Sequence, residues 1–159
     1  MDSTPLPSYQ AVVTAPGFCI GVRCDEDEIL GLDYLEPRPE LPPETALAAE
    51  AVRQLIAYLA DASFDFSLPL RPSGTPFQRR VWEQITSIPK HQTRTYGEVA
   101  KALHNAPRAV GQACGANPFP LIVPCHRVIA TGGGLGGFAR QRGGFLLDVK
   151  RWLLAHESR

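Results

Sequence analysis

A thiol and an imidazole stand next to each other in the segment Pro124-Cys125-His126-Arg127-Val128. The apolar run Leu121-Ile122-Val123 precedes it, and we predict a short buried strand there because a proline keeps the residue before it extended. Burial in apolar surroundings raises the pKa of a thiol above about 8.5 and makes it unreactive. A neighbouring base restores thiolate character, so Cys125 and His126 are candidates for nucleophilic chemistry. The alternative is a buried structural cysteine beside a satisfied core histidine.

Length and composition indicate an ordinary globular protein. The 159 residues are enough to bury a core as one compact unit or two small ones. No apolar run approaches the roughly 18 residues of a membrane span, and residues 1–5 are unlike a signal peptide, so we expect a cytoplasmic protein that does not bind membranes. We expect no cofactor and no metal, because the cysteine spacing matches no zinc pattern, and we expect reduced thiols at Cys19, Cys24, Cys114 and Cys125.

The net charge of zero conceals an uneven distribution of charge. Residues 1–75 hold four basic and twelve acidic side chains, a balance of −8, whereas residues 76–159 hold twelve basic and four acidic ones, a balance of +8. Such an asymmetry indicates a polyanionic partner for the basic half. The alternative is a set of basic residues spread over a solvated surface.

The acidic half has the pattern of an α+β layer. Alternating or apolar runs predict strands at 10–14, 18–23, 29–34 and 64–68, and apolar residues at helical spacing predict a helix over 45–60. Nothing in this half looks catalytic. The composition changes at 71–74, so we predict domains over residues 1–71 and 72–159.

The basic half has the pattern of short helices. Thr75 and Thr95 are typical N-caps, which predicts helices from Pro76 and over 96–103. Another short helix over 108–114 follows a tight turn, giving the outline of a helix-turn-helix. A last helix over 146–157 is expected to turn Lys150 and Arg151 outward.

Three further motifs belong together with the Cys-His pair. They are Arg108-Ala109-Val110-Gly111, Asn117 nine residues after Arg108, and the closing segment Lys150-Arg151-Trp152-Leu153-Leu154-Ala155-His156-Glu157. With these motifs the chain resembles the O6-alkylguanine-DNA alkyltransferases (methylated-DNA–protein cysteine methyltransferases). The resemblance is specific over about residues 72–157 and only architectural over the first 70. It implies an α+β fold with an RNase H-like α/β domain followed by a winged-helix-like domain that contains the helix-turn-helix.

The resemblance also implies an activity. It is the stoichiometric transfer of an alkyl group from O6-alkylguanine in double-stranded DNA to Cys125, by a monomer, with O4-alkylthymine as a second candidate substrate. His126 and Glu157 match a relay that activates the thiol, and Asn117 matches a hinge residue in the same network. Arg108 matches an arginine that intrudes into the duplex, and Tyr96 a tyrosine that helps rotate the nucleotide out. Further expected DNA contacts are Ala109, Gly111 and Arg127, and the expected substrate pocket is lined by Pro120, Val128, Phe138 and Ala139.

The residues support this chemistry independently. The O6 atom of a stacked guanine is out of reach of a buried thiol, so the base must be extruded, and a positively charged helix-turn-helix can position the backbone. Side chains of sequence neighbours diverge in an extended segment, so we expect His126 to reach Cys125 through a water. Glu157 would fix the imidazole tautomer, and Tyr96 could hydrogen-bond the departing guanine. The alternatives without a catalytic role are a solvated Glu157 and a Tyr96 that only covers a helix face. For Arg108 the alternative is a phosphate contact without intrusion into the duplex.

The chain departs from the family pattern at two places. The loop before the last helix is about five residues longer, and we expect this glycine-rich segment, 132–144, to be mobile and to bring Arg140 and Arg142 to the DNA. Cys114 stands on the recognition helix where a larger apolar residue is expected. These departures concern the preferred size of the alkyl group.

Other functions explain the residues less well. Alkyltransferase-like lesion-binding proteins lack the acceptor cysteine, which is present here as Cys125. A thiol hydrolase would require an oxyanion hole and a base that is not adjacent in sequence. A regulator that senses methylated phosphate would require an additional cysteine-rich domain, for which the chain has no room.

Overall fold

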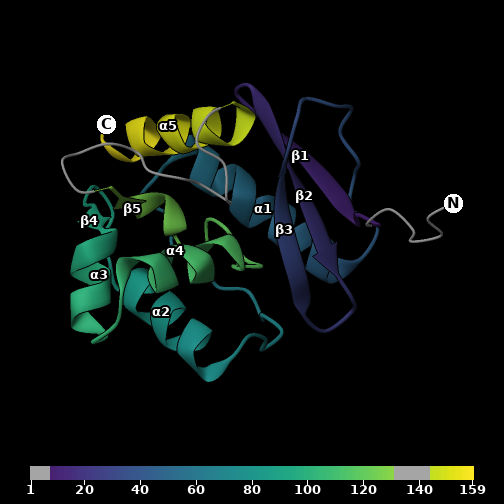
Figure 1. The fold of residues 1–159 in the computed structure, drawn as a ribbon. Coiled ribbons are helices and arrows are strands. Elements are labelled where there is room, and N and C mark those ends of the chain that lie inside the picture. Colours follow the sequence, from purple (N-terminus) through teal and green to yellow (C-terminus); the bar gives the residue numbers. More distant parts are fainter. Residues whose placement is uncertain (1–7, 131–143) are drawn as a thin grey trace, which may run out of the picture. The chain divides into compact units, whose positions relative to one another are not determined.

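The N-terminal half forms a small antiparallel sheet covered by one helix (Figure 1). Strands β1 (Ala11–Ala15), β2 (Phe18–Cys24) and β3 (Ile29–Leu35) pair in sequence order, and helix α1 (Ala46–Ala60) packs against β1 and β2. The meander and the helix predicted from hydrophobic periodicity are therefore confirmed.

The predicted strand over 64–68 is wrong. The ring of Phe66 packs 5.5 Å from that of Tyr58 on α1, and Phe64 packs edge to face on Phe66. The backbone of this segment bonds a side chain rather than a strand, because the Ser67 N–H donates to Gln54 Oε1 at 2.8 Å and Gln54 Nε2 donates to the Ser67 carbonyl at 3.0 Å. The alternating pattern reflects packing of aromatic rings on a helix.

The computed structural model describes residues 8–130 and 144–159, and the chain divides into two compact units, residues 1–71 and 72–159. No helix in the described part is long and apolar enough to cross a membrane. Each unit contains both strands and helices, so the fold is mixed α/β.

The described part of the second unit contains four α-helices: α2 (Pro76–Thr86), α3 (Tyr96–Ala102), α4 (Pro107–Gly115) and α5 (Phe145–Glu157). Thr75 and Thr95 cap the starts of α2 and α3, as the sequence predicts, and each cap is part of a capping box. A short turn joins α3 to α4, which contact each other, and this is the predicted helical hairpin. Trp82 on α2 donates from its indole N–H to the Ala113 carbonyl at 2.8 Å, which ties α2 to α4.

The predicted strand over 121–123 is replaced by a series of turns. Leu121 adopts a positive φ of 75°, and the Val123 and Cys125 N–H groups bond the carbonyls of Phe119 and Val123, both at 2.8 Å. Cys125–Arg127 then form a single 3₁₀ turn, η1. Local turn hydrogen bonds, rather than a sheet ladder, thus carry the thiol into the interior. The following strand β5 (Val128–Ile129) pairs in parallel with β4 (Arg94–Thr95), each only two residues long.

Helix α5 corrects a third expectation, because Lys150 points inward. Its side chain is fully buried, and Leu147 and Leu153, one turn away on either side, are buried on the same face. Arg151 is exposed, as expected.

Candidate active site

Asn117 fixes both the loop and the thiol of Cys125. Its Nδ2 donates to the Val123 carbonyl at 2.9 Å and to the Cys125 Sγ at 3.4 Å, while its Oδ1 accepts from the Phe119 N–H at 2.9 Å. One amide side chain therefore bonds two residues of the turn series and the first residue of η1. Cys125 itself is 3% exposed, so only a group admitted into the interior can reach its sulfur.

A second thiol affects the first. Cys114 lies in the last turn of α4. Its side chain, together with burial, raises the pKa of the Cys125 thiol well above its usual value. The hydrogen bond from Asn117 and the charge of Lys150 act in the opposite direction. In the resting protein Cys125 is thus a neutral thiol.

His126, Glu157 and Arg127 form a buried ionic network. His126 Nε2 lies 2.7 Å from Glu157 Oε2, and Arg127 binds both carboxylate oxygens, with Nε 2.7 Å from Oε1 and Nη2 3.0 Å from Oε2. The guanidinium also donates to the Ile88 carbonyl at 2.9 Å. A carboxylate that binds a guanidinium in this bidentate way is ionised, so Glu157 is neither a solvated charge nor a neutral acid.

The charged Glu157 determines the tautomer of His126. An ionised carboxylate only accepts hydrogen bonds, so the imidazole carries its proton on Nε2 and exposes a lone pair on Nδ1. Burial lowers the pKa of His126, and the hydrogen bond to Glu157 only partly offsets this. Nδ1 is buried and has no hydrogen-bond partner within residues 8–130 and 144–159. A neutral imidazole with a free lone pair is a proton acceptor.

Comparison with known proteins identifies the family of this chain. The family model for the DNA-binding domain of 6-O-methylguanine DNA methyltransferase matches residues 76–159. The methylated-DNA–protein-cysteine methyltransferase of Methanosarcina acetivorans is 39% identical over 94% of this chain and 98% of its own. The chain belongs to the 6-O-methylguanine DNA methyltransferase family. The constitutive methylated-DNA–protein-cysteine methyltransferase of Bacillus subtilis is 44% identical over 68% of each chain.

Solved structures agree with this assignment. The OGT protein of Mycobacterium tuberculosis in complex with DNA superimposes with a TM-score of 0.78 at 36% identity, over 92% of this chain and 91% of its own. An O6-methylguanine DNA methyltransferase from Methanococcus jannaschii superimposes with a TM-score of 0.65 at 28% identity, over 92% of each chain. The likeness therefore extends beyond the C-terminal unit that the family model matches.

In this methyltransferase-family chain, a functional candidate that sequence reasoning missed is Lys150. Its ammonium donates to the Val128 carbonyl at 2.7 Å and lies 5.8 Å from the centre of the Tyr96 ring. Burial lowers the pKa of Lys150 to about 8, whereas the nearby thiols of Cys114 and Cys125 favour its charged form. Burial also raises the pKa of the Tyr96 phenol, with the same two thiols adding to the effect. Tyr96 and Lys150 thus lie in the electrostatic surroundings of the thiol pair. The sequence signal that could have indicated its burial is its position three residues from both Leu147 and Leu153, which places the three side chains on one face of α5.

The expected DNA contacts separate into two groups. Arg108 is exposed, and it lines a shallow groove of about 660 Å³ along α4 together with Gln78, Gly111, Gln112 and Ala116. Ala109 is half-buried beside it. Arg127 lies elsewhere: it is buried against Glu157, so its guanidinium is part of the ionic network rather than of a DNA-binding surface.

The expected substrate-pocket residues are only partly within the described chain. Val128 is buried and its carbonyl holds Lys150, and Pro120 is half-buried in the turn series before the thiol. Phe138 and Ala139, and the arginines at 140 and 142, fall in 131–143, outside the described residues. Within the described part, no group of three or more His, Cys, Asp or Glu side chains could hold a metal.

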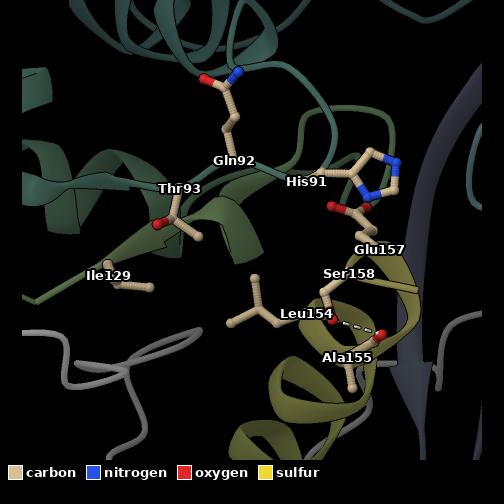
Figure 2. A pocket seen from close by; sticks show the side chains of 8 residues that line it. All are labelled: His91, Gln92, Thr93, Ile129, Leu154, Ala155, Glu157 and Ser158. Carbon is tan, nitrogen blue, oxygen red and sulfur yellow. Dashed lines mark hydrogen bonds between the residues drawn. The ribbon is translucent and has the colours of Figure 1, made fainter.

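A separate pocket of about 370 Å³ opens at the Glu157 end of the network (Figure 2). Figure 2 shows aliphatic side chains from α5 and β5 along its walls, with Glu157 and His91 at one end. Among the residues that the structure describes, its lining includes Glu157 but not Cys125. We therefore do not assign this pocket to the alkyl substrate.

Proposed function

We propose that this protein repairs O6-alkylguanine in double-stranded DNA by transferring the alkyl group to Sγ of Cys125, acting once per molecule, as a monomer in the cytoplasm. The observation that carries the proposal is the buried Cys125 thiol, held by Asn117 and followed by a histidine whose tautomer Glu157 fixes. The activity is the one that the names of the relatives state.

DNA binding is assigned to the α4 surface of the basic unit. Arg108 is the first residue after Pro107 at the start of α4 and is exposed, and the next turn carries Gly111. Phosphates attract arginine, and a glycine leaves room for a backbone to approach. Because Cys125 is buried, the damaged base must leave the stack to meet it, and Arg108 then occupies the space in the duplex.

In the transfer step Cys125 loses its proton, and the C–O bond of the lesion is replaced by a C–S bond. His126 Nδ1 takes the Cys125 proton, through a bridging water, because the two side chains belong to adjacent residues of η1. The thiolate attacks the alkyl carbon, a C–S bond forms, and the electrons of the breaking C–O bond pass to O6 of the guanine. The guanine anion accepts a hydrogen bond from the Tyr96 phenol, as we propose, and takes up a proton from solvent.

Lys150 stabilises negative charge in this step. The ammonium is fully buried beside the Tyr96 ring, and its Coulomb interaction favours the Cys125 thiolate. The thioether product has no leaving group comparable to a guanine, so the acceptor is not regenerated. A lesion-binding protein without transfer is disfavoured because the acceptor thiol and its proton acceptor are both in place.

Replacing the acceptor tests the assignment. Cys125→Ser should abolish transfer from an O6-methylguanine duplex yet retain affinity for that duplex, because the α4 surface is unchanged. Cys24→Ser, which removes a buried thiol of the other unit, is the matched control and should transfer normally. Transfer that survives in Cys125→Ser would overturn the assignment.

A further inference from the structure

The groove along α4 is lined by two glutamine side chains that differ in what they already bond. Gln78 Oε1 accepts from the Thr75 N–H at 2.9 Å, so this oxygen belongs to the capping box of α2. Among the described residues, none bonds the side-chain amide of Gln112, which is exposed. Gln112 therefore offers the groove both an acceptor oxygen and an NH2 donor.

Gln112 follows Arg108 by about one turn of the helix. Residues four positions apart lie on the same face of a helix, about 6 Å apart along its axis. Both side chains are exposed and line the same groove, and the groove residues Gly111 and Ala116 are small. The face that brings Arg108 to the DNA therefore brings Gln112 as well, displaced by about two base-pair steps of about 3.4 Å each.

An intruding side chain determines which edge of the base pairs this face meets. Side chains that insert between base pairs do so from the minor groove, and they kink the duplex toward the major groove, which opens the minor groove for a protein surface. The surface next to Arg108 then faces the minor groove. There every base pair presents acceptors, and only a G·C pair adds a donor, the N2 amine of guanine.

We propose that Gln112 reads a base pair beside the lesion and favours G·C there, an inference that rests on the proposed function. Gln112 Nε2 donates to guanine N3 while Gln112 Oε1 accepts from guanine N2, so the amide is bonded at both ends. Opposite an A·T pair only the donor finds a partner, and Oε1 loses its water without a replacement. Gln112 thus makes the affinity for damaged DNA depend on the sequence around the lesion.

The test uses base analogues that differ only by the minor-groove amine. Inosine is the guanine analogue without this amine, and 2,6-diaminopurine is the adenine analogue with it. Duplexes carry O6-methylguanine and one changed pair, at either of the two nearest positions on each side. Affinity is measured with Cys125→Ser, and single-turnover transfer with the unchanged protein. At one of these positions inosine in place of guanine should lower affinity by about fivefold, and 2,6-diaminopurine in place of adenine should raise it by about as much.

Two matched variants separate the reading of the amine from the properties of the analogues. Gln112→Leu, which is similar in size but cannot form hydrogen bonds, should lose the dependence on the amine. Gln84→Leu, at a half-buried glutamine of α2 that does not line the groove, should keep it.

The outcomes distinguish this inference from the proposed function. The same dependence on the amine in Gln112→Leu, or none in the unchanged protein, would overturn the base-reading role and leave alkyl transfer unaffected. No transfer from any duplex, with a dependence of affinity on the amine that Gln112→Leu abolishes, would support the base-reading role and refute the proposed function.

Discussion

Nε2 of His126 and Oε2 of Glu157 lie 2.7 Å apart, and the two side chains are only 1% and 2% exposed. The guanidinium of Arg127 keeps this carboxylate charged, so the imidazole is oriented by an anion and still remains neutral itself. Orientation and charge are thereby separated: Glu157 holds the tautomer, Arg127 balances the charge, and His126 Nδ1 is left to accept a proton.

Glu157→Gln should slow transfer and destabilise the protein. The amide does not hold the Nε2–H tautomer firmly and leaves Arg127 buried without its counter-ion, which costs about 3 kcal/mol of unfolding free energy. Transfer should fall by about a hundredfold, both from duplex DNA and from free O6-benzylguanine. Denaturant unfolding and single-turnover rates measure both effects. Asp148→Asn, which breaks the exposed pair with Arg151, is the control and should change little. Unchanged transfer in Glu157→Gln would refute the orienting role.

Arg108→Ala should slow alkyl transfer from duplex DNA but not from free O6-benzylguanine. An arginine that occupies the place of the extruded nucleotide matters only where a stack exists. We expect transfer from duplex DNA to slow by about tenfold or more, and the reaction with free O6-benzylguanine to keep its rate. Arg151→Ala, another exposed arginine of the same unit, is the control. Equal losses on both substrates would contradict the intruding role.

Gly111→Ala should stabilise the fold and weaken DNA binding. A Cβ at this position meets no atom within 4 Å, and alanine favours a helix by about 0.5–1 kcal/mol over glycine. The thermal midpoint should therefore rise. Duplex affinity should fall by about tenfold, because the methyl group enters the space assigned to the DNA backbone. Affinity that stays constant would mean that the DNA does not approach α4 at this residue.

Lys150 should make stability depend on pH above neutrality. Its pKa is lowered from 10.5 to about 8 on folding, so between these values the unfolded chain binds a proton that the folded protein has released. Unfolding free energy should rise with pH across this window, relative to Lys150→Met, which does not titrate. Urea titrations in a Cys125→Ser background remove the contribution of that thiol. Lys101→Met, at an exposed lysine of α3, is the control for the loss of a surface lysine. A pH-independent difference for Lys150→Met would mean that Lys150 keeps its usual pKa.

The elements that could be predicted from sequence are those with local causes. Thr75 and Thr95 mark helix starts because their capping hydrogen bonds involve residues three positions away. The strands expected at 64–68 and 121–123 failed because apolar spacing reports burial and not backbone geometry. At 121–123 the backbone instead follows the positive φ of Leu121, the turn hydrogen bonds and the bonds from the Asn117 side chain, which apolar spacing does not report.

Site residues that belong to a recognisable motif could be named from the sequence. Charged residues that are buried, against the usual preference of such side chains for the surface, could not. The Cys-His pair and Glu157 came from motif resemblance, and the structure places His126 and Glu157 in contact. Arg127 and Lys150 were expected at the surface, because charged side chains rarely lie inside unless they are bonded. The carboxylate and the carbonyl that bond them lie 30 and 22 positions away in the chain, respectively.

The most direct test of the account is the mass of the reduced protein after incubation with excess O6-methylguanine duplex. We expect a gain of one methyl group, about 14 Da, located on Cys125 in the tryptic peptide of residues 109–127, and no further reaction with fresh duplex. Sustained turnover, or a methyl group located on Cys114 instead of Cys125, would contradict the account.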